Sequence, residues 1–492
     1  MKRKTKTAPA ARHKLAGLLP PGIFCFNAEE VRVLSQSLSS RTSLHSNRQV
    51  NSWLADKLNR PELKVDTVSL KETEGWIIEP DTGNICHESG RFFSITGVHV
   101  RHRTISSELE WDQPLIDQPE TGILGILVKN IRGVLHFCLQ AKEEPGNINS
   151  VQLSPTVQAT YSNYTGAHGG AKPLFLEHFL SVPQERHLFA RLQTEDGGRF
   201  LYKSNRNMLV WSDDNVSIDL PEGFIWLTLA QIARLQKREN LLHATTRSVL
   251  SAAFVAGHRK CKSICPRNGA LIPGQEIISS IDDALQWIDD VKASNHILIK
   301  RKGLRELQEW GMDRDGSFSH NEGRFFRVVG VRVTSPVREV SHWCQPVLDN
   351  PGQGVIGLLM REHEGERFYL MQAKAEVGNR NIVQIAPTVQ FTPGNYIGNL
   401  KLPKPFLFDD FHDGNRFPLL FESLQSEEGA RFFKETHVHR IMVLPVGVEL
   451  ALPPDFRWVS EINLGFLLGM GEKVNSCARS ILSCLLCLGS EK

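Results

Sequence analysis

The feature that most constrains this chain is an internal duplication. At an offset of 232 residues, Ala141-Lys-Glu-Glu-Pro-Gly-Asn-Ile-Asn-Ser-Val-Gln-Leu-Ser-Pro-Thr-Val-Gln-Ala-Thr160 aligns with Ala373-Lys-Ala-Glu-Val-Gly-Asn-Arg-Asn-Ile-Val-Gln-Ile-Ala-Pro-Thr-Val-Gln-Phe-Thr392. Extended through Asn163-Tyr164 and Asn395-Tyr396, 15 of the 24 positions are identical, whereas ordinary residue usage gives about one or two identities by chance. The chain therefore contains two copies of one module.

The two copies match well beyond this block. The further pairs are Trp53 with Trp287, Trp76 with Trp310, Gly90-Arg-Phe-Phe93 with Gly323-Arg-Phe-Phe326, and Trp111-Asp-Gln-Pro114 with Trp343-Cys-Gln-Pro346. Each copy spans roughly 200 residues, which is the size of a domain and too long for a solenoid repeat. We predict a disordered basic tail over residues 1–20, a first repeat over 21–256, a linker over 257–285, rich in turn dipeptides, and a second repeat over 286–492.

Within the first copy, strands and helices are both expected. Residues 91–100, 121–128, 133–142 and 151–160 are rich in β-branched and aromatic residues or form short apolar runs, which predicts strands. Residues 227–235 and 244–253 carry apolar residues at helical spacing. Because the strands come in runs without a βαβ rhythm, we expect an α+β fold with antiparallel or mixed sheets and flanking helices.

Composition excludes several classes of protein. The net charge is +3 and the lysines and arginines are spread along the chain, which argues against a nucleic-acid partner. No apolar stretch reaches the ~20 residues that cross a bilayer, so no membrane partner is expected. The nine cysteines lack framework spacing, and we interpret them as reduced thiols of a cytoplasmic protein.

The familiar motifs of nucleotide and metal sites are absent. Gly166-Ala-His-Gly-Gly-Ala-Lys172 has the wrong spacing for a phosphate-binding loop, and no Gly-x-Gly-x-x-Gly follows a strand. His437 and His439 could share one face of a strand, but a third ligand is not close in sequence. A pair of surface histidines is favoured there, and no metal site is predicted.

Polar residues are concentrated in the block from Lys142 to Tyr164. On a strand, Gln152, Ser154, Thr156 and Gln158 would project from one side. Amides and hydroxyls are costly to bury without partners, so this face either meets water or lines a polar ligand site. The second copy keeps the polar set while its apolar positions vary, which favours a ligand site.

These residues resemble a known family. Trp111-x-Gln-Pro114, Lys142-x-Glu-x-Gly-Asn147, Val151-Gln-Leu-Ser-Pro-Thr-Val-Gln-Ala-Thr160 and Asn163-Tyr164 are similar to the signature of the nucleotide-hexose 2,3-dehydratases of deoxysugar biosynthesis. The resemblance extends from about Trp53 over nearly the whole chain.

The resemblance implies a homodimeric carbon–oxygen lyase whose subunit holds two repeats of a Nudix-hydrolase-like domain. It would act on dTDP-4-keto-6-deoxyglucose without a metal or redox cofactor and pass a 3,4-diketo-2,6-dideoxy sugar to a downstream 3-ketoreductase. The glutamate-rich box of Nudix enzymes is missing here, and a shared fold does not fix function. A non-catalytic sugar-nucleotide-binding protein is the main alternative, and an active Nudix-type pyrophosphatase is a third.

The proposed chemistry defines the groups that the site needs. Because the C4 ketone acidifies the C3 hydrogen, a base can remove it and a general acid can assist departure of the C2 hydroxyl. Glu144, Tyr164 and His168 are the candidates for the base and the donor, and Lys142 or Asn163 could face the enolate oxygen. Glu144 could equally be a structural partner of Lys142, and His168 a plain loop histidine.

The remaining candidates are assigned to substrate binding. In the first copy these are Arg91, Trp111, Gln113, Asn147, Gln152, Thr156, Gln158, Thr160 and Asn163. In a second pocket they are Trp343, Lys374, Glu376, Asn379, Gln384, Thr388, Gln390, Thr392, Asn395 and Tyr396. The tryptophans could instead belong to the core, and Arg91 could brace a turn instead of binding pyrophosphate.

The second copy departs from the first at several positions. It has Val377, Ala386 and Phe391 where the first has Pro145, Ser154 and Ala159, and it lacks a histidine equivalent to His168. We therefore expect the first copy to be the catalytic one.

Overall fold

The computed structural model describes residues 26–104, 107–160, 172–213, 215–257, 277–336, 340–363, 365–399 and 402–489. The predicted tail at 1–20 lies outside these residues, as does most of the predicted linker. Helix α7 begins at Ile281, so the last residues of the range predicted as a linker belong to the second repeat.

Each repeat forms one large mixed sheet. The seven-stranded sheet of the first repeat has the order β10-β11-β6-β7-β12, with β8 beside β7 and β9 beside β6. Its strands are β6 (Ile123–Ile131), β7 (Val134–Glu143), β8 (Val151–Pro155), β9 (Val157–Ala159), β10 (His187–Thr194), β11 (Ser204–Trp211) and β12 (Phe224–Thr228). All pairs are antiparallel except β6 with β11.

The eight-stranded sheet of the second repeat repeats this plan. Its order is β13-β25-β20-β19-β24-β23, with β21 beside β20 and β22 beside β19. Its strands are β13 (Ile277–Ile278), β19 (Gly354–His363), β20 (Glu366–Ala375), β21 (Val383–Ala386), β22 (Val389–Phe391), β23 (Leu419–Ser426), β24 (Thr436–Val443) and β25 (Phe456–Ser460). The equivalent parallel pair, β19 with β24, is present, and β13 adds a second parallel pair with β25.

The two smaller sheets are completed by exchange of strands between the repeats. β1 (Lys64–Val68) pairs with β17 (Arg327–Thr334), and β14 (His296–Lys302) pairs with β4 (Ser94–Arg103), both antiparallel. The other members are β2 (Trp76–Ile78), β3 (Ile85–His87) and β5 (Glu108–Asp117) in one sheet, and β15 (Trp310–Met312), β16 (Phe318–His320) and β18 (His342–Asp349) in the other. Each small sheet thus contains four strands of one repeat and one strand of the other.

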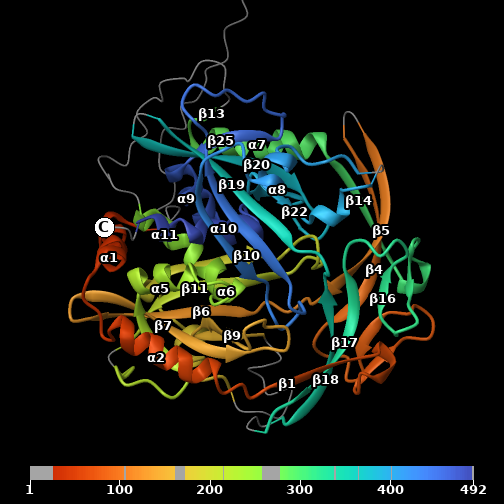
Figure 1. Ribbon diagram of the computed structural model, residues 1–492, viewed down its shortest axis with the longest axis horizontal. Helices are drawn as coiled ribbons and strands as arrows, with labels where there is room; N and C mark the ends of the chain where they lie inside the picture. The colour runs from red at the N-terminus through yellow and green to blue at the C-terminus, as the bar shows by residue number, and fades with distance from the viewer. Residues whose placement is uncertain are drawn as a thin grey trace, which may run out of the picture.

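Helices cover the sheets and join the repeats. They are α1 (Ala28–Ser39), α2 (Asn47–Leu58), α4 (Glu177–Leu180), α5 (Leu229–Gln236), α6 (Ala244–Leu250), α7 (Ile281–Ser294), α8 (Phe408–Asp413), α9 (Glu461–Met470), α10 (Ser476–Cys484) and α11 (Leu486–Gly489). In Figure 1, α6, α9, α10 and α11 lie between the sheet that contains β6 and β7 and the sheet that contains β19 and β20, while β4, β5, β14 and β17 lie to the right.

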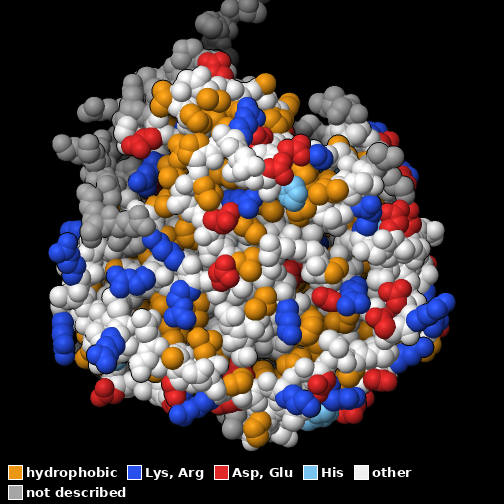
Figure 2. All heavy atoms as spheres, in the orientation of Figure 1, with side chains coloured by type: hydrophobic (Ala, Val, Ile, Leu, Met, Phe, Trp, Pro, Cys, Tyr) orange, Lys and Arg blue, Asp and Glu red, His pale blue; other side chains and the backbone are white. Residues whose placement is uncertain are grey.

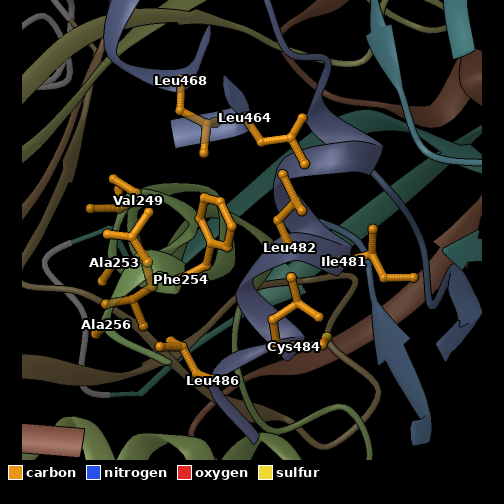
Figure 3. Close-up of a cluster of buried hydrophobic side chains, with 14 of the residues drawn as sticks. Val249, Ala253, Phe254, Ala256, Leu464, Leu468, Ile481, Leu482, Cys484 and Leu486 are labelled. Atoms are coloured by element: carbon orange, nitrogen blue, oxygen red, sulfur yellow. The ribbon is translucent and has the colours of Figure 1, made fainter. Parts of the chain in front are cut away.

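One hydrophobic core is shared by both repeats. Figure 3 shows Phe254 of the first repeat beside Leu482 and Leu464 of the second. All three side chains are almost completely buried and belong to the same cluster. Because burial of apolar area is the main favourable term in folding, each repeat depends on the other for its stability.

The predicted elements are largely confirmed. The strands predicted in the first copy appear as β4, β6, β7 and the β8–β9 segment, which is interrupted at Thr156. The predicted helix at 244–253 ends at Leu250 and continues as a 3-10 turn over Ser251–Gly257. The observed sheets are mixed, which is one of the two predicted arrangements, antiparallel or mixed. The likeness to the Nudix fold stays a prediction.

The surface carries charges of both signs. Basic and acidic side chains are interspersed over the face seen in Figure 2. In the described part of the chain, no helix combines the length and the apolar character needed to cross a membrane.

Candidate active site

The polar block of the first repeat begins at the end of β7 and continues into a tight turn. Pro145 and Gly146 occupy this turn, and the backbone N–H of Asn147 closes it onto the carbonyl of Glu144 at 3.0 Å. The turn leaves the Glu144 carboxylate buried, with Oε1 3.0 Å from Lys142 Nζ. Asn147 holds the turn by donating to the carbonyls of Lys142 and Ser150.

His243 is the second partner of Glu144. It precedes α6 as the N-cap residue, and its Nδ1 accepts a hydrogen bond from the backbone N–H of Thr245. The other ring nitrogen, Nε2, lies 2.8 Å from Glu144 Oε2, and the His243 side chain is fully buried. Both oxygens of Glu144 are therefore engaged, one by Lys142 and one by His243.

Gln158 connects this group to the second repeat. Its Oε1 accepts from Lys142 Nζ at 3.1 Å, and its Nε2 donates to Glu428 Oε1 at 3.2 Å. Glu428 follows β23, so the acidic end of the network comes from the other repeat. A continuous set of polar contacts thus runs from His243 through Glu144, Lys142 and Gln158 to Glu428.

The loop that carries Glu428 is docked closely on the first repeat. The backbone N–H of Gly146 donates to the carbonyl of Gly429 at 2.7 Å. A Cβ at Gly429 would lie 2.2 Å from Asn147 Oδ1, so only glycine fits there. The first site is therefore a composite of both repeats, and we refer to Lys142, Glu144, Gln158, His243 and Glu428 as the first composite site.

An equivalent second composite site contains Lys374, Glu376, Gln390, Asn475 and Asp196. Lys374 Nζ is 3.6 Å from Glu376 Oε1, and Gln390 Nε2 donates to the same carboxylate at 2.6 Å. Asn475 Nδ2 donates to Gln390 Oε1 at 2.8 Å. The amide of Gln390 thus bonds within its own repeat, whereas that of Gln158 reaches across to Glu428.

The two sites differ most in their histidines. The equivalent of His243 is Asn475. Beside the first site, His437 Nε2 lies 3.2 Å from Glu427 Oε1, and the equivalent of His437 is Asn205, whose Nδ2 donates to Glu195. The two histidines come from different repeats, yet both lie on the side of the first composite site.

A cavity lies where the repeats meet. Its lining consists of six pairs of equivalent residues: Glu195 and Glu427, Asp196 and Glu428, Phe200 and Phe432, Ala244 and Ser476, Thr245 and Cys477, and Ser248 and Ser480. The reciprocal arrangement places this cavity on an approximate twofold axis between the two composite sites. Glu428 and Asp196 face it from opposite repeats.

The carboxylates of the site have different proton affinities. Burial raises the pKa of Glu428 to about 6, and the negative charge of Glu144 acts in the same direction. Burial also raises the pKa of Asp196 to about 6. For Glu144, burial is outweighed by the charges and hydrogen bonds of Lys142 and His243, so its pKa lies well below the usual range. Glu144 stays ionised under conditions in which Glu428 exchanges a proton.

Several predicted ligand residues bond within the protein. Thr156 Oγ1 donates to the carbonyl of Cys138 at 2.5 Å and accepts from the backbone N–H of Leu127 at 3.0 Å, which ties β6 to β7. Thr388 does the same in the second repeat. The chain bends at Thr156 and turns that hydroxyl inward, and ligand binding by the polar face stays a prediction.

The glutamines that precede these threonines lie at the contact between the repeats. Gln152 Nε2 donates to Ser426 Oγ at 2.5 Å, and Gln384 Oε1 accepts from Thr194 Oγ1 at 2.9 Å. These bonds join the two repeats, and the role of both glutamines in substrate binding stays a prediction. In the second repeat Thr392 accepts from Asn350, and Thr160 also has a polar partner.

The tryptophan motif supports the acidic loops. Trp111 Nε1 donates to Gln113 Oε1 at 2.7 Å, and Gln113 Nε2 donates to the carbonyl of Gly198 at 3.1 Å. Trp343 makes the matching bond to Gln345. Both indoles are half-buried. Gln113 and Gln345 in turn donate to backbone carbonyls of the loops that carry Asp196 and Glu428. The tryptophans therefore support these loops through the glutamines, which agrees with the alternative of a structural role.

The remaining predicted residues are divided between the second pocket and the segment outside the described residues. Asn395 Oδ1 accepts from the backbone N–H of Phe325, and Tyr396 packs its ring near Phe391 and Phe408. Arg324, the equivalent of Arg91, donates to the carbonyls of Gly394, Ile397 and Gly398 and so braces this turn. Asn379 donates to Glu376.

The last predicted residues of the first copy are four. Asn163, Tyr164 and His168 lie outside the described residues, and Arg91 is exposed.

The prediction of a surface pair at His437 and His439 was wrong. His439 is completely buried, and its Nε2 lies 2.8 Å from Ser480 Oγ. The strand that carries both residues runs inside the contact between the repeats, where the other repeat covers the face they share. Among the described residues, no cluster of three or more histidine, cysteine or acidic side chains could hold a metal ion.

His243 and Glu428 were not identified from the sequence. His243 lies 99 residues from Glu144 along the chain, and no local motif marks it. The signal that was available is the duplication: at the 232-residue offset His243 aligns with Asn475, and Glu428 with Asp196. Comparison at this offset would have indicated His243 as the chemically different member of its pair, and Glu428 as a member of a pair of acids that both repeats keep.

Comparisons with known proteins identify the family of this chain. The family model described as NDP-hexose 2,3-dehydratase matches residues 47–253 and 281–485, one match for each repeat. A dTDP-4-dehydro-6-deoxy-alpha-D-glucopyranose 2,3-dehydratase of Amycolatopsis orientalis is 38% identical over 440 residues, 89% of each chain. A protein of the same description from Saccharopolyspora spinosa is 36% identical, over 92% of this chain and 94% of the relative. A third, from Streptomyces violaceoruber, is 35% identical over 88% and 96%.

Proposed function

The chain belongs to the NDP-hexose 2,3-dehydratase family, and we propose that it eliminates water across C2 and C3 of dTDP-4-keto-6-deoxyglucose. The product would be the 3,4-diketo-2,6-dideoxy sugar, still attached to dTDP. The names of the three relatives support this substrate. Because water is lost and no external electrons are transferred, the reaction requires no redox cofactor.

The proposed reaction begins with removal of the C3 hydrogen. The electron pair moves toward the C4 carbonyl and gives an enolate, which a fixed positive charge stabilises. Lys142 is suited to this role because its ammonium is only partly buried, at 24% exposure, and is held by Glu144 and Gln158. Collapse of the enolate then forms the C2–C3 double bond and expels the C2 hydroxyl.

Glu144 is assigned a positioning role in this proposal. Both its oxygens are engaged and its pKa is lowered, so it is a weak base. It fixes the ammonium of Lys142, and His243 fixes Glu144. Tyr164 and His168, in the segment outside the described residues, stay the predicted candidates for the base at C3.

The observation that carries the proposal is the exchange of His243 for Asn475 between otherwise equivalent networks. An imidazole ring differs from an amide in the acid–base chemistry that it can take part in. The first composite site is therefore proposed as the catalytic one. The second composite site keeps Lys374 and Glu376 and stays the predicted second sugar-nucleotide pocket.

The test is incubation of the purified protein with dTDP-4-keto-6-deoxyglucose, followed by NMR of the sugar. A 3-ketoreductase with its nicotinamide cofactor traps the diketone as a stable 2-deoxy sugar. Formation of that sugar supports the proposal. Tight binding of the substrate without conversion would instead support the non-catalytic alternative, and Mg²⁺-dependent release of dTMP would support a pyrophosphatase.

A further inference from the structure

Glu428 is the acidic group that joins the first composite site from the other repeat. Its Oε1 accepts a hydrogen bond from Gln158 Nε2 at 3.2 Å, and its side chain lines the cavity between the repeats. Through Gln158 it is linked to Lys142, the group proposed to face the enolate. Glu428 therefore lies beside the proposed reacting centre and also lines the small cavity between the repeats.

Glu428 differs from Glu144 in the properties that matter for giving up a proton. Glu144 is clamped by a lysine and a histidine, and its pKa lies below the usual range. Glu428 is bonded by a neutral amide, and burial together with the nearby charge of Glu144 raises its pKa to about 6. A carboxyl group that holds its proton near neutral pH is suited to general acid catalysis.

We propose that Glu428 donates the proton with which the C2 hydroxyl departs, so that an acid of the second repeat completes the catalytic site of the first. This inference rests on the proposed function and adds a catalytic residue to it. It assigns a chemical reason to the composite architecture, because Lys142 comes from the first repeat and Glu428 from the second.

The elimination step balances as follows. After the base has taken the C3 proton, the enolate electron pair forms the C2–C3 double bond while the C4 carbonyl is restored. The C2–O bond breaks, and the departing oxygen takes the carboxyl proton of Glu428 and leaves as water. The enol then loses its O3 proton and gains one at C2, and proton exchange with solvent returns the base and Glu428 to their starting states.

Asp196, the equivalent of Glu428 in the second composite site, lacks the bond to a glutamine amide that Glu428 has. Asp196 is one methylene shorter than Glu428, and Gln390 donates to Glu376 of its own repeat. The Asp196 carboxylate accepts a hydrogen bond from the backbone N–H of Gly198 at 2.8 Å. The acid and the amide of this site are therefore not linked as Glu428 and Gln158 are.

The test compares two substrates whose C2 leaving groups differ in their need for a proton. Glu428→Gln keeps the shape of the side chain and removes the acid. With the C2-hydroxyl substrate we expect turnover to fall by about 100-fold or more. With the 2-fluoro analogue, from which fluoride departs without protonation, we expect fluoride release within about fivefold of the unmodified protein. Equal losses with both substrates would overturn the inference.

Two further measurements keep the result interpretable. Exchange of the C3 hydrogen in D₂O reports the first step alone, and it should survive in Glu428→Gln; its loss together with water elimination would contradict the assignment. Glu29→Gln, which removes a carboxylate from the exposed face of α1, should retain turnover of the hydroxyl substrate within a fewfold, with unfolding midpoints of both variants measured in parallel. If the unmodified protein itself releases no water, the proposed function fails, which is a different outcome from a defect confined to Glu428→Gln.

Discussion

The Nε of Arg247 lies 2.8 Å from the hydroxyl of Ser480, and the Nε of Arg479 lies 2.9 Å from that of Ser248. These two arginines are completely buried and equivalent in the duplication. Each also donates to a backbone carbonyl of the opposite repeat, Arg247 to Ser426 and Arg479 to Thr194. The repeats are therefore joined by a reciprocal pair of buried cations.

Removing one of these cations should destabilise the whole chain. Arg247→Ala leaves buried carbonyls without donors and creates a void, so we expect the free energy of unfolding to fall by about 3–5 kcal/mol. Arg479→Ala should have a similar effect because its contacts are equivalent. Urea unfolding followed by circular dichroism measures both. Arg32→Ala, on the exposed face of α1, is the control and should change stability by less than about 0.5 kcal/mol; an equal loss there would contradict this account.

The histidine of the first composite site should matter for turnover more than for binding. His243→Asn recreates the residue of the second site and removes one of the two partners of Glu144. We expect kcat to fall by about 10- to 100-fold, since a small displacement of a catalytic group has effects of this size. Binding of dTDP, measured by calorimetry, should change little. Asn475→Ala is the matched variant and should leave kcat within a fewfold; a larger loss in it than in His243→Asn would contradict the assignment.

The close approach at Gly429 offers a separate test of the composite site. A methyl group there would meet Asn147 Oδ1 at 2.2 Å, and one at Gly197 would meet Asn379 Oδ1 at 2.6 Å. Gly429→Ala should displace the loop that carries Glu428 and lower kcat by about 10-fold or more. Gly197→Ala should lower the free energy of unfolding by a similar amount, but it should lower kcat less than Gly429→Ala does. Steady-state kinetics with thermal unfolding separates the two effects, and equal kcat in both variants would argue against the first site as the catalytic one.

The raised pKa values of Glu428 and Asp196 predict how stability varies with pH. Both groups have folded-state pKa values of about 6, above their unfolded values, so the folded state binds more protons between about pH 4 and pH 6. Their contribution to stability is full below the unfolded pKa and is lost as pH rises through about 6. Replacing Glu428 with Gln should therefore reduce the decline in unfolding free energy between pH 5 and pH 7.5, measured in urea. An unchanged slope would show that Glu428 does not titrate in this range.

Much of the site was predictable because its residues lie close together in sequence. Lys142, Glu144, Asn147 and Gln158 belong to one duplicated block, and the structure brings Lys142, Glu144 and Gln158 into direct contact. The strand prediction was accurate over the same region because its residues are rich in β-branched and other apolar side chains. The inward turn of Thr156 was missed, since periodicity does not show where a strand bends.

What could not be predicted depends on contacts between the repeats. β1 has the short, polar sequence Lys-Val-Asp-Thr-Val, which gives no sign that it joins a sheet of the other repeat. Glu428 and His437 are placed by the docking of one repeat on the other, and sequence distance hides such contacts. The burial of His439 has the same origin, because its strand face becomes internal only when the repeats associate.

The central claim is that 2,3-dehydration occurs in the first composite site. The most direct measurement is the rate of 2-deoxy sugar formation, in the assay coupled to a 3-ketoreductase, for Lys142→Met and Lys374→Met. These variants remove the same ammonium from equivalent positions. We predict that Lys142→Met loses at least about 100-fold in kcat and that Lys374→Met stays within about fivefold of the unmodified protein. A loss confined to Lys374→Met, or an equal loss in both, would contradict the account.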